Sequence, residues 1–331
     1  MIVLCWKSAD RIGACLESLQ RQTFTDFELI VIDNGSTDGS LAAVRALWPS
    51  ATILQQTTNT GFTGGVNRGL RYMLKGPAEF AWQLNDDTEF GPGVLGELVA
   101  RADEPDRPGL VSPYLVDADG RVVFGPDGPY PPARGRPGAR PRRVRPETAL
   151  FLPGTALFIR REVIERIGLL DPRYFFYCDD DDFCLRADDA GFDAAYCDRA
   201  VVRHAFEPRI RARGAAAIYF RLRNKLLFQR TYAPIGAWPR FSVRTVSAAI
   251  RQATRHRARG EGAFAEAALA GAWDGLLGRT GGPYDPERLM PRWLARVLMA
   301  RRGFLGEALR GRFRTAVRRA AGGRARTTVR R

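Results

Sequence analysis

The stretch FELIVIDNGS, residues 27–36, joins an apolar, partly β-branched run directly to an acidic turn that contains a glycine. The run predicts a buried strand, because strands covered on both faces are apolar at successive positions. The segment FAWQLNDD, residues 80–87, has the same arrangement, with a predicted strand followed by Asn85-Asp86-Asp87. Both predicted strands therefore end in carboxylates.

The residues around these two stretches alternate between strand and helix patterns. The additional predicted elements are strands over 2–6 and 51–54 and helices near 12–19, 41–47 and 64–74. Asp38 or Ser40 can cap the second of these helices. The alternation predicts a parallel α/β sheet. Ligands bind beyond the carboxyl ends of parallel strands, so Asp33 and Asp87 are expected in one site.

The next part of the chain predicts a second half of the same domain. Its predicted elements are a strand over 150–160, helices over 161–167 and 183–190, and a strand over 200–204. Residues 125–147 are rich in Pro, Gly and Arg and predict either a mobile loop or an insertion. An aromatic run leads into four aspartates, Asp179 to Asp182, and the last strand ends in His204.

The net charge of +15 belongs to the C-terminal third of the chain. Residues 206–331 contain 28 Lys and Arg against 7 Asp and Glu, whereas the preceding residues are net acidic. Such asymmetry indicates an acidic partner, such as anionic lipid headgroups, a phosphorylated substrate or nucleic acid, or else a solvated surface in an Arg-rich proteome. Helical patterns near 219–227, 243–250, 264–277 and 292–300, and an apolar stripe over 304–317, predict a basic helical extension.

Composition and termini exclude several classes of protein. The hydrophobic content of 45% suits a globular chain with one large core or two smaller ones. No apolar run reaches the roughly 18 residues of a membrane-spanning helix, and the first residues do not resemble a signal peptide, so a cytoplasmic protein is expected. The five cysteines are irregularly spaced and contain no Cys-x-x-Cys pair, so neither a disulfide framework nor a zinc site is predicted.

Two separated acidic clusters suit the transfer of a sugar from a nucleotide diphosphate. A divalent cation neutralises the diphosphate as it leaves, and Mg²⁺ or Mn²⁺ takes carboxylate and phosphate oxygens as ligands. Asp86 and Asp87 are candidates for that cation. The acceptor hydroxyl loses a proton as it attacks, and a carboxylate within reach accepts it. The run 179–182 supplies such groups, and mutual repulsion with partial burial is expected to raise some of their pKa values.

The ordered motifs resemble a family 2 glycosyltransferase with a GT-A fold, close to bacterial rhamnosyltransferase-like and galactofuranosyltransferase-like members. The resemblance covers about residues 2–230. The residues that carry it are DNGSTDG at 33–39, NTGF at 59–62 with Asn67, LNDDT at 84–88, IGLLD at 167–171, FFYCDDDDFCLR at 175–186, and His204.

The resemblance implies a nucleotide-sugar site in the first half of the domain. It implies that Asp33 contacts the nucleobase or ribose and that Asn59, Gly61, Asn67 and Asp86 belong to the same donor site. These expectations define a nucleotide-binding part over 1–90 within a catalytic domain over 1–205, and an acceptor-side part over 91–205.

The resemblance also implies a metal site for Mg²⁺ or Mn²⁺. Asp87 matches the last acid of the family's Asp-x-Asp motif, whose first acid is here Asn85. That departure leaves one carboxylate from the motif, and His204 matches a histidine that completes the metal site in related enzymes.

The acidic run is assigned by the same resemblance. Asp180 matches the catalytic base of an inverting reaction, which proceeds by one displacement without a covalent enzyme intermediate. Asp179 replaces the usual Glu and is expected to contact the acceptor. Asp182 is expected on the acceptor side too, or to brace the loop together with Arg186.

We therefore predict an α/β GT-A domain over 1–205 with a basic helical extension over 206–331. The predicted reaction transfers a sugar from a dTDP- or UDP-linked donor to a glycan, lipid-linked saccharide or metabolite hydroxyl, in cell-surface glycan or glycosylated-metabolite biosynthesis. The extension is expected either to bind peripherally to the inner face of the cell membrane or, alternatively, to close over the active site or form an oligomer contact. The alternatives are a nucleotidyltransferase, disfavoured because no Gly-rich basic signature lies near the N-terminus, and a nucleic-acid-binding protein, disfavoured because the acidic half would repel phosphate.

Overall fold

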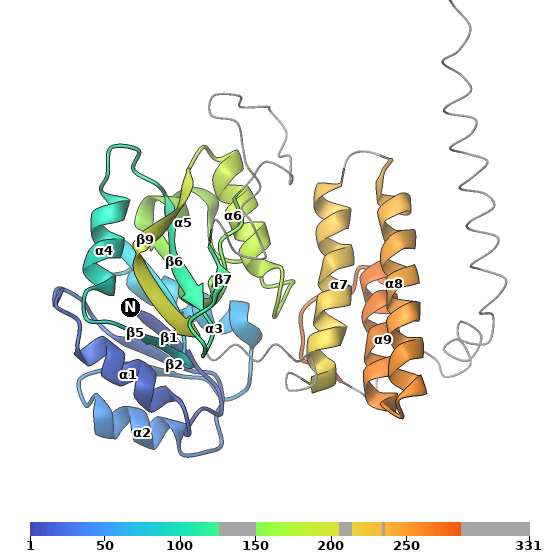
Figure 1. The fold of residues 1–331 in the computed structure, drawn as a ribbon, viewed down its shortest axis with the longest axis horizontal. Helices are drawn as coiled ribbons and strands as arrows, with labels where there is room; N and C mark the ends of the chain where they lie inside the picture. Colours follow the sequence, from blue (N-terminus) through green and yellow to red (C-terminus); the bar gives the residue numbers. More distant parts are fainter. Residues whose placement is uncertain (126–149, 205–213, 234–235, 286–331) are drawn as a thin grey trace, which may run out of the picture.

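The computed structural model describes residues 1–125, 150–204, 214–233 and 236–285 (Figure 1). The described residues form a nine-stranded sheet in the order β3-β2-β1-β4-β8-β6-β9-β5, with β7 paired to β6. The first four strands along the chain are parallel, as the alternating pattern predicts. They are β1 Ile2–Cys5, β2 Ile30–Asp33, β3 Thr52–Gln55 and β4 Phe80–Asn85, and the helices between them are α1 Ile12–Gln20, α2 Ser40–Leu47 and α3 Gly61–Met73.

The second half of the sheet is mixed in direction. Strand β8 is antiparallel to β4 and β6, β9 is parallel to β6, and β5 is antiparallel to β9. The elements of this half are β5 Thr88–Phe90, α4 Val94–Ala102, β6 Leu110–Val116, β7 Val122–Phe124, β8 Phe158–Arg160, α5 Arg161–Ile167, α6 Asp179–Asp189 and β9 Ala194–His204. The antiparallel pairing of β5 with β9 decides where the last residue of β9 lies.

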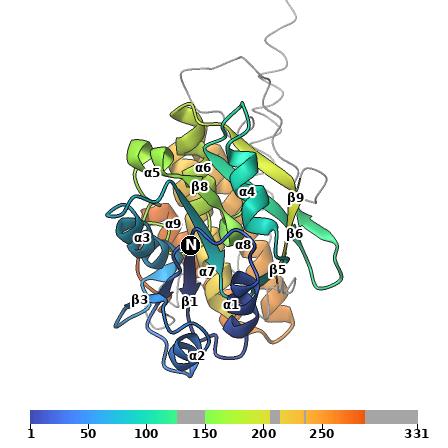
Figure 2. The same ribbon diagram turned by 90° about the vertical axis from the view of Figure 1, so that its left-hand side faces the viewer.

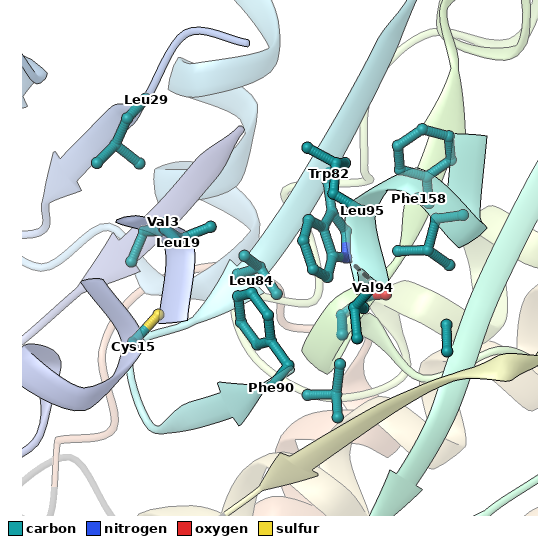
Figure 3. Close-up of a cluster of buried hydrophobic side chains, with 14 of the residues drawn as sticks. Val3, Cys15, Leu19, Leu29, Trp82, Leu84, Phe90, Val94, Leu95 and Phe158 are labelled. Atoms are coloured by element: carbon teal, nitrogen blue, oxygen red, sulfur yellow. Dashed lines mark hydrogen bonds between the residues drawn. The ribbon is translucent and has the colours of Figure 1, made fainter. Parts of the chain in front are cut away.

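Apolar side chains fill both faces of the sheet. One cluster packs α1, α2 and α4 against one face, and the other packs α3, α5 and α6 against the opposite face. Trp82 is 1% exposed in the first cluster, where its indole Nε1 donates to the carbonyl of Ala156 at 3.2 Å. Its ring lies beside Phe90, with Leu84 and Phe158 nearby (Figure 3). Strand β4 is thereby anchored along its length, which fixes the position of the residues that follow it.

Three predicted boundaries in the second half are wrong, and one of them is the start of the strand expected over 200–204, which begins at Ala194. The helix expected over 183–190 begins at Asp179, so the four aspartates form its first turn rather than a preceding loop. Free N–H groups and the helix dipole favour negative charge at that end of a helix. The strand expected over 150–160 is limited to Phe158–Arg160, because Gly154–Ala156 forms a 3-10 turn. That turn places backbone N–H groups beside the acidic run.

The C-terminal helices form a separate bundle with its own core. Helices α7 Gly214–Tyr232, α8 Trp238–Ala258 and α9 Gly262–Leu277 confirm three of the predicted helical segments. Figures 1 and 2 show the bundle beside the sheet domain, with α7 on the side that faces it. The helix predicted at 292–300, the stripe at 304–317 and the segment 126–147 lie outside the described residues. Among the helices of the described ranges, none is long and apolar enough to cross a membrane.

Candidate active site

The carboxyl ends of β1, β2 and β4 meet at one edge of the sheet. The register places Cys5 beside Asp33 and Leu4 beside Asn85, so the segments after all three strands start together. The loop after β1 bridges the other two. The Trp6 backbone N–H donates to Asp86 Oδ2 at 3.2 Å, and the next N–H, of residue 7, donates to a hydroxyl in the turn after β2. The structure therefore brings both strand-terminal clusters together at one edge of the sheet, where one site is expected.

Asp33 ends β2 with one carboxylate oxygen available for a ligand. The side chain is 1% exposed, and its Oδ1 accepts a hydrogen bond from the Ser36 N–H at 2.9 Å. Its Oδ2 is buried and has no hydrogen-bond donor from the protein. A buried carboxylate oxygen without a donor is costly, and a hydroxyl or N–H of a ligand would satisfy it. This chemistry fits the expected contact with a nucleobase or ribose.

The neighbouring Asn34 organises the loop before α3, a role that sequence reasoning missed. Its Oδ1 accepts from Gln56 Nε2 at 2.8 Å and from the Thr60 N–H at 3.0 Å. Its Nδ2 donates to Asn59 Oδ1 at 3.2 Å, and that same Asn59 oxygen accepts from the Gly61 N–H at 2.7 Å. The Asn59 amide therefore shapes the loop in this structure, and its expected contact with the donor stays a prediction.

Two more residues of the expected donor site contact the second half of the domain. The buried Asn67 amide donates to the Leu170 carbonyl at 2.8 Å and accepts from the Leu170 N–H at 3.0 Å, so both of its ends bond the backbone. Gly61 has φ +79° and packs against Phe175, whose carbonyl oxygen would lie 2.3 Å from an added Cβ. The structure thus gives both residues a role in joining the two halves, which the motifs alone do not reveal.

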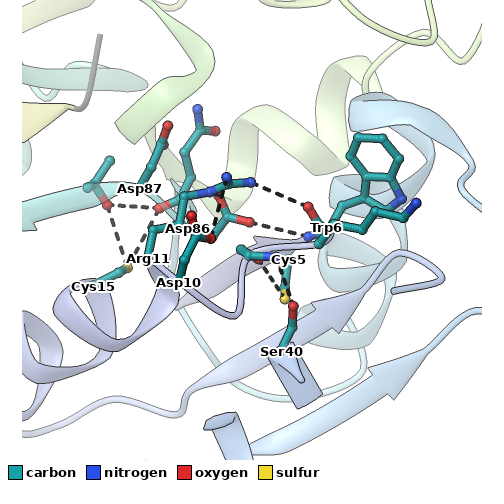
Figure 4. Close-up of polar contacts among 12 residues, drawn as sticks. Cys5, Trp6, Asp10, Arg11, Cys15, Ser40, Asp86 and Asp87 are labelled. Carbon is teal, nitrogen blue, oxygen red and sulfur yellow. Dashed lines mark hydrogen bonds and ion pairs between the residues drawn. The ribbon is translucent and has the colours of Figure 1, made fainter. Parts of the chain in front are cut away.

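Asp86 is turned away from its neighbour Asp87 and toward α1. Its Oδ1 lies 3.3 Å from Arg11 Nε, and its Oδ2 accepts from the Trp6 N–H (Figure 4). Burial raises the pKa of Asp86, although Arg11 opposes the shift. Arg11 belongs to no motif, and the sequence does not predict its contact with Asp86. The middle acid of the Asn-Asp-Asp motif therefore supports the loop after β1.

Asp87 and His204 are brought together by the pairing of β5 with β9. The register places Thr88 opposite His204, so the histidine lies beside the residue just before β5. His204 Nε2 is 3.1 Å from Asp87 Oδ1 and 3.5 Å from Asn85 Nδ2. Burial by itself would raise the pKa of Asp87, but the nearby His204 and Arg11 hold that pKa below its usual value. Asp87 is therefore ionised at neutral pH.

These two side chains fit a divalent cation that also takes ligands from a substrate. Asp87 Oδ1 is buried and faces His204 Nε2 at 3.1 Å, so an oxygen and a nitrogen that can both coordinate a metal meet at one point. Within the described ranges, no group of three or more His, Cys, Asp or Glu side chains is placed to hold a metal alone. Mg²⁺ and Mn²⁺ accept two protein ligands when phosphate oxygens and water complete the coordination. The donor set therefore suits a metal that binds together with a diphosphate.

Asp180 lies in the first turn of α6 and is held by backbone groups. Its Oδ2 accepts from the Gly154 N–H at 3.0 Å, and its Oδ1 accepts from the Asp181 N–H at 3.0 Å. The Gly154 carbonyl in turn accepts from Gln83 Nε2 at 2.7 Å, two residues before the end of β4. This chain of contacts connects the acidic run to the strand that carries Asn85. Burial raises the pKa of Asp180 against these two hydrogen bonds, which suits a proton acceptor.

The other three aspartates differ in their surroundings. Asp179 is 3% exposed, and its Oδ2 is buried without a donor. Burial and then the charge of Asp180 raise the pKa of Asp179 well above its usual value. Burial, followed by the charges of its neighbours, raises the pKa of Asp181 to about 7. Asp179 therefore has an oxygen available for an acceptor hydroxyl.

Asp182 has no such oxygen. Its Oδ2 accepts from Arg186 Nε at 2.7 Å, and its Oδ1 accepts from the Tyr232 hydroxyl at 2.6 Å. The side chains of α6 and α7 thus hold both oxygens of Asp182, whereas those of Asp180 accept from backbone N–H groups, so the contacts favour bracing of α6 against α7 over the acceptor contact that is also expected of Asp182.

Comparison with known proteins identifies the family of this chain. Residues 1–168 match the family described as "Glycosyl transferase family 2". An N-acetylglucosaminyl-diphospho-decaprenol L-rhamnosyltransferase of Mycobacterium tuberculosis is 28% identical over 236 residues, which cover 62% of this chain and 75% of that protein. A PGL/p-HBAD biosynthesis glycosyltransferase of Mycobacterium bovis is 40% identical over 106 residues, covering 30% of this chain and 40% of that protein.

The fold is also similar to that of a solved glycosyltransferase. The crystal structure of S. aureus TarS 1-349 in complex with UDP-GlcNAc superposes with a TM-score of 0.51 at 16% identity, covering 84% of this chain and 91% of that one. The family match favours the glycosyltransferase over the nucleotidyltransferase alternative. The chain belongs to glycosyl transferase family 2 and is a glycosyltransferase with the GT-A fold.

Proposed function

We propose that this enzyme transfers a sugar, with inversion and in the presence of Mg²⁺ or Mn²⁺, from a nucleotide diphosphate sugar to an acceptor hydroxyl. The observation that carries the proposal is the meeting of two potential metal ligands, since the buried Oδ1 of Asp87 lies 3.1 Å from Nε2 of His204. It supports a cation at the same sheet edge as Asp33 and the acidic run.

Each residue of the proposed site has a separate role in a single displacement reaction. Asp33 would hold the base or ribose of the donor, and Asp87 with His204 would hold the cation. When bound, the cation neutralises the charge that develops on the departing diphosphate. Asp180 accepts the proton of the acceptor hydroxyl. The bond from the acceptor oxygen to the sugar C1 forms as the bond from C1 to the diphosphate oxygen breaks, so the configuration at C1 inverts.

The donor and acceptor classes are proposed from the similar proteins. The mycobacterial relative is named for L-rhamnosyl transfer to a diphospho-decaprenol-linked sugar. We propose a dTDP- or UDP-linked, rhamnose-like donor and a glycan or lipid-linked acceptor in cell-surface glycan biosynthesis, with a glycosylated metabolite as the other possible product. Asp179 would contact the acceptor, because its buried oxygen lacks a donor.

A panel of nucleotide sugars tests the donor assignment. The full-length protein is heated with Mn²⁺ and each of dTDP-rhamnose, UDP-glucose, UDP-N-acetylglucosamine and GDP-mannose. A donor present at about 100 times its Kd stabilises the folded state by about 2.7 kcal/mol, which is readily detected as a higher Tm. Stabilisation by a dTDP- or UDP-sugar that requires Mn²⁺ supports the proposal. Stabilisation by none of them, or equal stabilisation without metal, contradicts it.

We further propose that the basic bundle binds the anionic inner face of the cell membrane. Arg244, Arg251 and Arg255 are exposed on α8 at helical spacing and so lie on one face. Flotation with vesicles that contain anionic lipid tests this, with neutral vesicles and the triple Arg→Glu variant as matched controls. Binding only to anionic vesicles, and only by the unaltered chain, is expected. Absence of binding to anionic vesicles would remove the membrane from the proposal.

A further inference from the structure

The segment that leads into the acidic run has a strained backbone. Phe175, Tyr177 and Cys178 have φ values of 64°, 70° and 62°, in the left-handed region that residues with a Cβ avoid. A side chain at Cβ crowds the backbone in that conformation, so each of these residues is strained relative to a right-handed one. Cys178 immediately precedes α6, and its carbonyl accepts from the Asp182 N–H at 3.1 Å. The conformation of this segment therefore sets the direction in which α6, and with it Asp180, begins.

One side chain of α7, that of Asn224, bonds three carbonyls of this segment. Asn224 is fully buried, and the carbonyl oxygens of Tyr174, Phe176 and Tyr177 lie 2.8, 2.7 and 2.9 Å from its Nδ2, so its two N–H groups donate to three acceptors and one of them is shared. Three carbonyl oxygens that converge on one amide nitrogen require the alternation of backbone directions that the left-handed residues produce. The Asn224 amide thus compensates the strain with buried hydrogen bonds.

The orientation of the Asn224 amide is itself fixed. Arg223 is 1% exposed, and its Nε donates to Asn224 Oδ1 at 2.8 Å, which leaves Nδ2 as the group that faces the segment. Arg223 Nη2 also donates to the Tyr174 carbonyl at 2.7 Å. On the opposite side, the Thr63 N–H at the start of α3 donates to the Phe175 carbonyl at 3.4 Å. The segment is therefore held between the donor half of the domain and α7.

We infer that Asn224 is a positioning residue for sugar transfer, which holds residues 174–178 in the conformation that aims Asp180 at the acceptor. The inference rests on the proposed function, in which Asp180 is the base. It gives the helical bundle a part in the reaction that no motif of the sequence indicates. The proposed donor site consists of Asp33 and of the cation that Asp87 and His204 would hold, whereas Asn224 bonds residues 174–177, so donor binding should not depend on Asn224.

The test compares kcat with donor affinity in three full-length variants. Asn224→Asp keeps the shape but replaces the donating nitrogen with an oxygen that repels the three carbonyls, and Asn224→Ala removes the contact. Misplacement of a reacting group by about 1 Å costs about 100-fold in rate, so kcat is expected to fall by about that factor while the Kd of the donor by calorimetry is unchanged. Thr245→Val is the matched control, because it removes a buried hydrogen bond of 3.1 Å between α8 and Gln229 of α7 and should leave kcat unchanged.

A rescue experiment separates positioning from general stability. Glycine adopts the left-handed conformation without strain. The double variant with Asn224→Ala and Cys178→Gly is therefore expected to have a kcat at least about tenfold higher than that of Asn224→Ala alone, whereas a purely structural loss would not be rescued. Arg223→Lys, which keeps the charge but loses the fixed contact to Asn224, should give an intermediate loss. An unchanged kcat in folded Asn224→Asp, or a loss that Cys178→Gly fails to restore, would overturn the inference. Asp180→Asn is measured beside them, and retained turnover in that variant would refute the base assignment independently of the result for Asn224.

Discussion

Replacing Asp87 with Asn tests the metal site without changing its shape. The carboxylate becomes an amide of the same size, so the packing near His204 is kept while one negative charge is lost. The pKa of Asp87 is held below its usual value, so the wild-type side chain is charged at neutral pH and the variant differs from it by a full unit of charge. The expected consequence is weaker binding of the cation and of any diphosphate that binds with it.

The magnitude follows from the ligand set. Asp87 and His204 are the two protein groups that meet at this point, and Asp87 supplies the negative charge that attracts a cation. Two unit charges about 4 Å apart interact by roughly 4 kcal/mol at the effective dielectric of a partly buried site. The amide oxygen that remains can still coordinate, so part of this energy is retained. We expect a loss of about 2.8 kcal/mol, which corresponds to about 100-fold weaker Mn²⁺-dependent donor binding.

The assay is calorimetric titration of the donor at several Mn²⁺ concentrations. Asp86→Asn is the matched control, because Asp86 faces Arg11 and the Trp6 N–H, and the metal requirement should survive its loss. Asp87→Asn should require a much higher Mn²⁺ concentration for the same occupancy. If Asp87→Asn titrates like the wild type, or if Asp86→Asn loses the metal dependence instead, the assignment of the metal ligand is wrong.

Three further perturbations test the fold and the electrostatics. Asp181→Asn should raise Tm more at pH 8 than at pH 5. The pKa of Asp181 is about 7 in the folded state against a usual 3.8, so between these values the folded state binds a proton that the unfolded state has released, and the stability of the wild type falls as pH rises. A gain in Tm that does not depend on pH would contradict the raised pKa. Gly61→Ala should destabilise by more than about 1 kcal/mol in urea unfolding and reduce transfer, because the new Cβ meets Phe175 at φ +79°, and unchanged stability would show that the contact relaxes easily. Trp82→Ala should lower the free energy of unfolding by about 3–5 kcal/mol in the same experiment, since it leaves a buried cavity and removes a hydrogen bond. A decrease below about 1 kcal/mol would contradict the packing described for β4.

Local sequence patterns predict much of this fold because they report burial along single strands and helices. The apolar runs that precede Asp33 and Asn85 are strands, and the expected helix over 161–167 has the observed bounds. Four adjacent like charges repel one another, and the sequence pattern places residues 179–182 in a loop. These residues instead form the first turn of α6, because the N-terminus of a helix favours negative charge.

Contacts between distant segments are what the sequence does not reveal. His204 lies beside Asp87 only because β9 pairs with β5, a register that no local pattern specifies. Asn224 is a polar residue in a basic helix with no motif around it, and its role depends on three carbonyls some 50 residues earlier. The same holds for Arg11 and Asn34, whose partners are set by how the strand ends meet.

In the proposed mechanism, Asp180 accepts the proton of an acceptor hydroxyl during an inverting sugar transfer. The most direct measurement is transfer by wild type and Asp180→Asn, with the donor that the panel identifies, an acceptor and Mn²⁺, together with NMR of the anomeric configuration of the product. We expect the wild type to give a product with inverted anomeric configuration. We expect Asp180→Asn to lose transfer but to retain donor binding in calorimetry. Transfer by Asp180→Asn at the wild-type rate, or a product with retained configuration, would contradict the proposed mechanism.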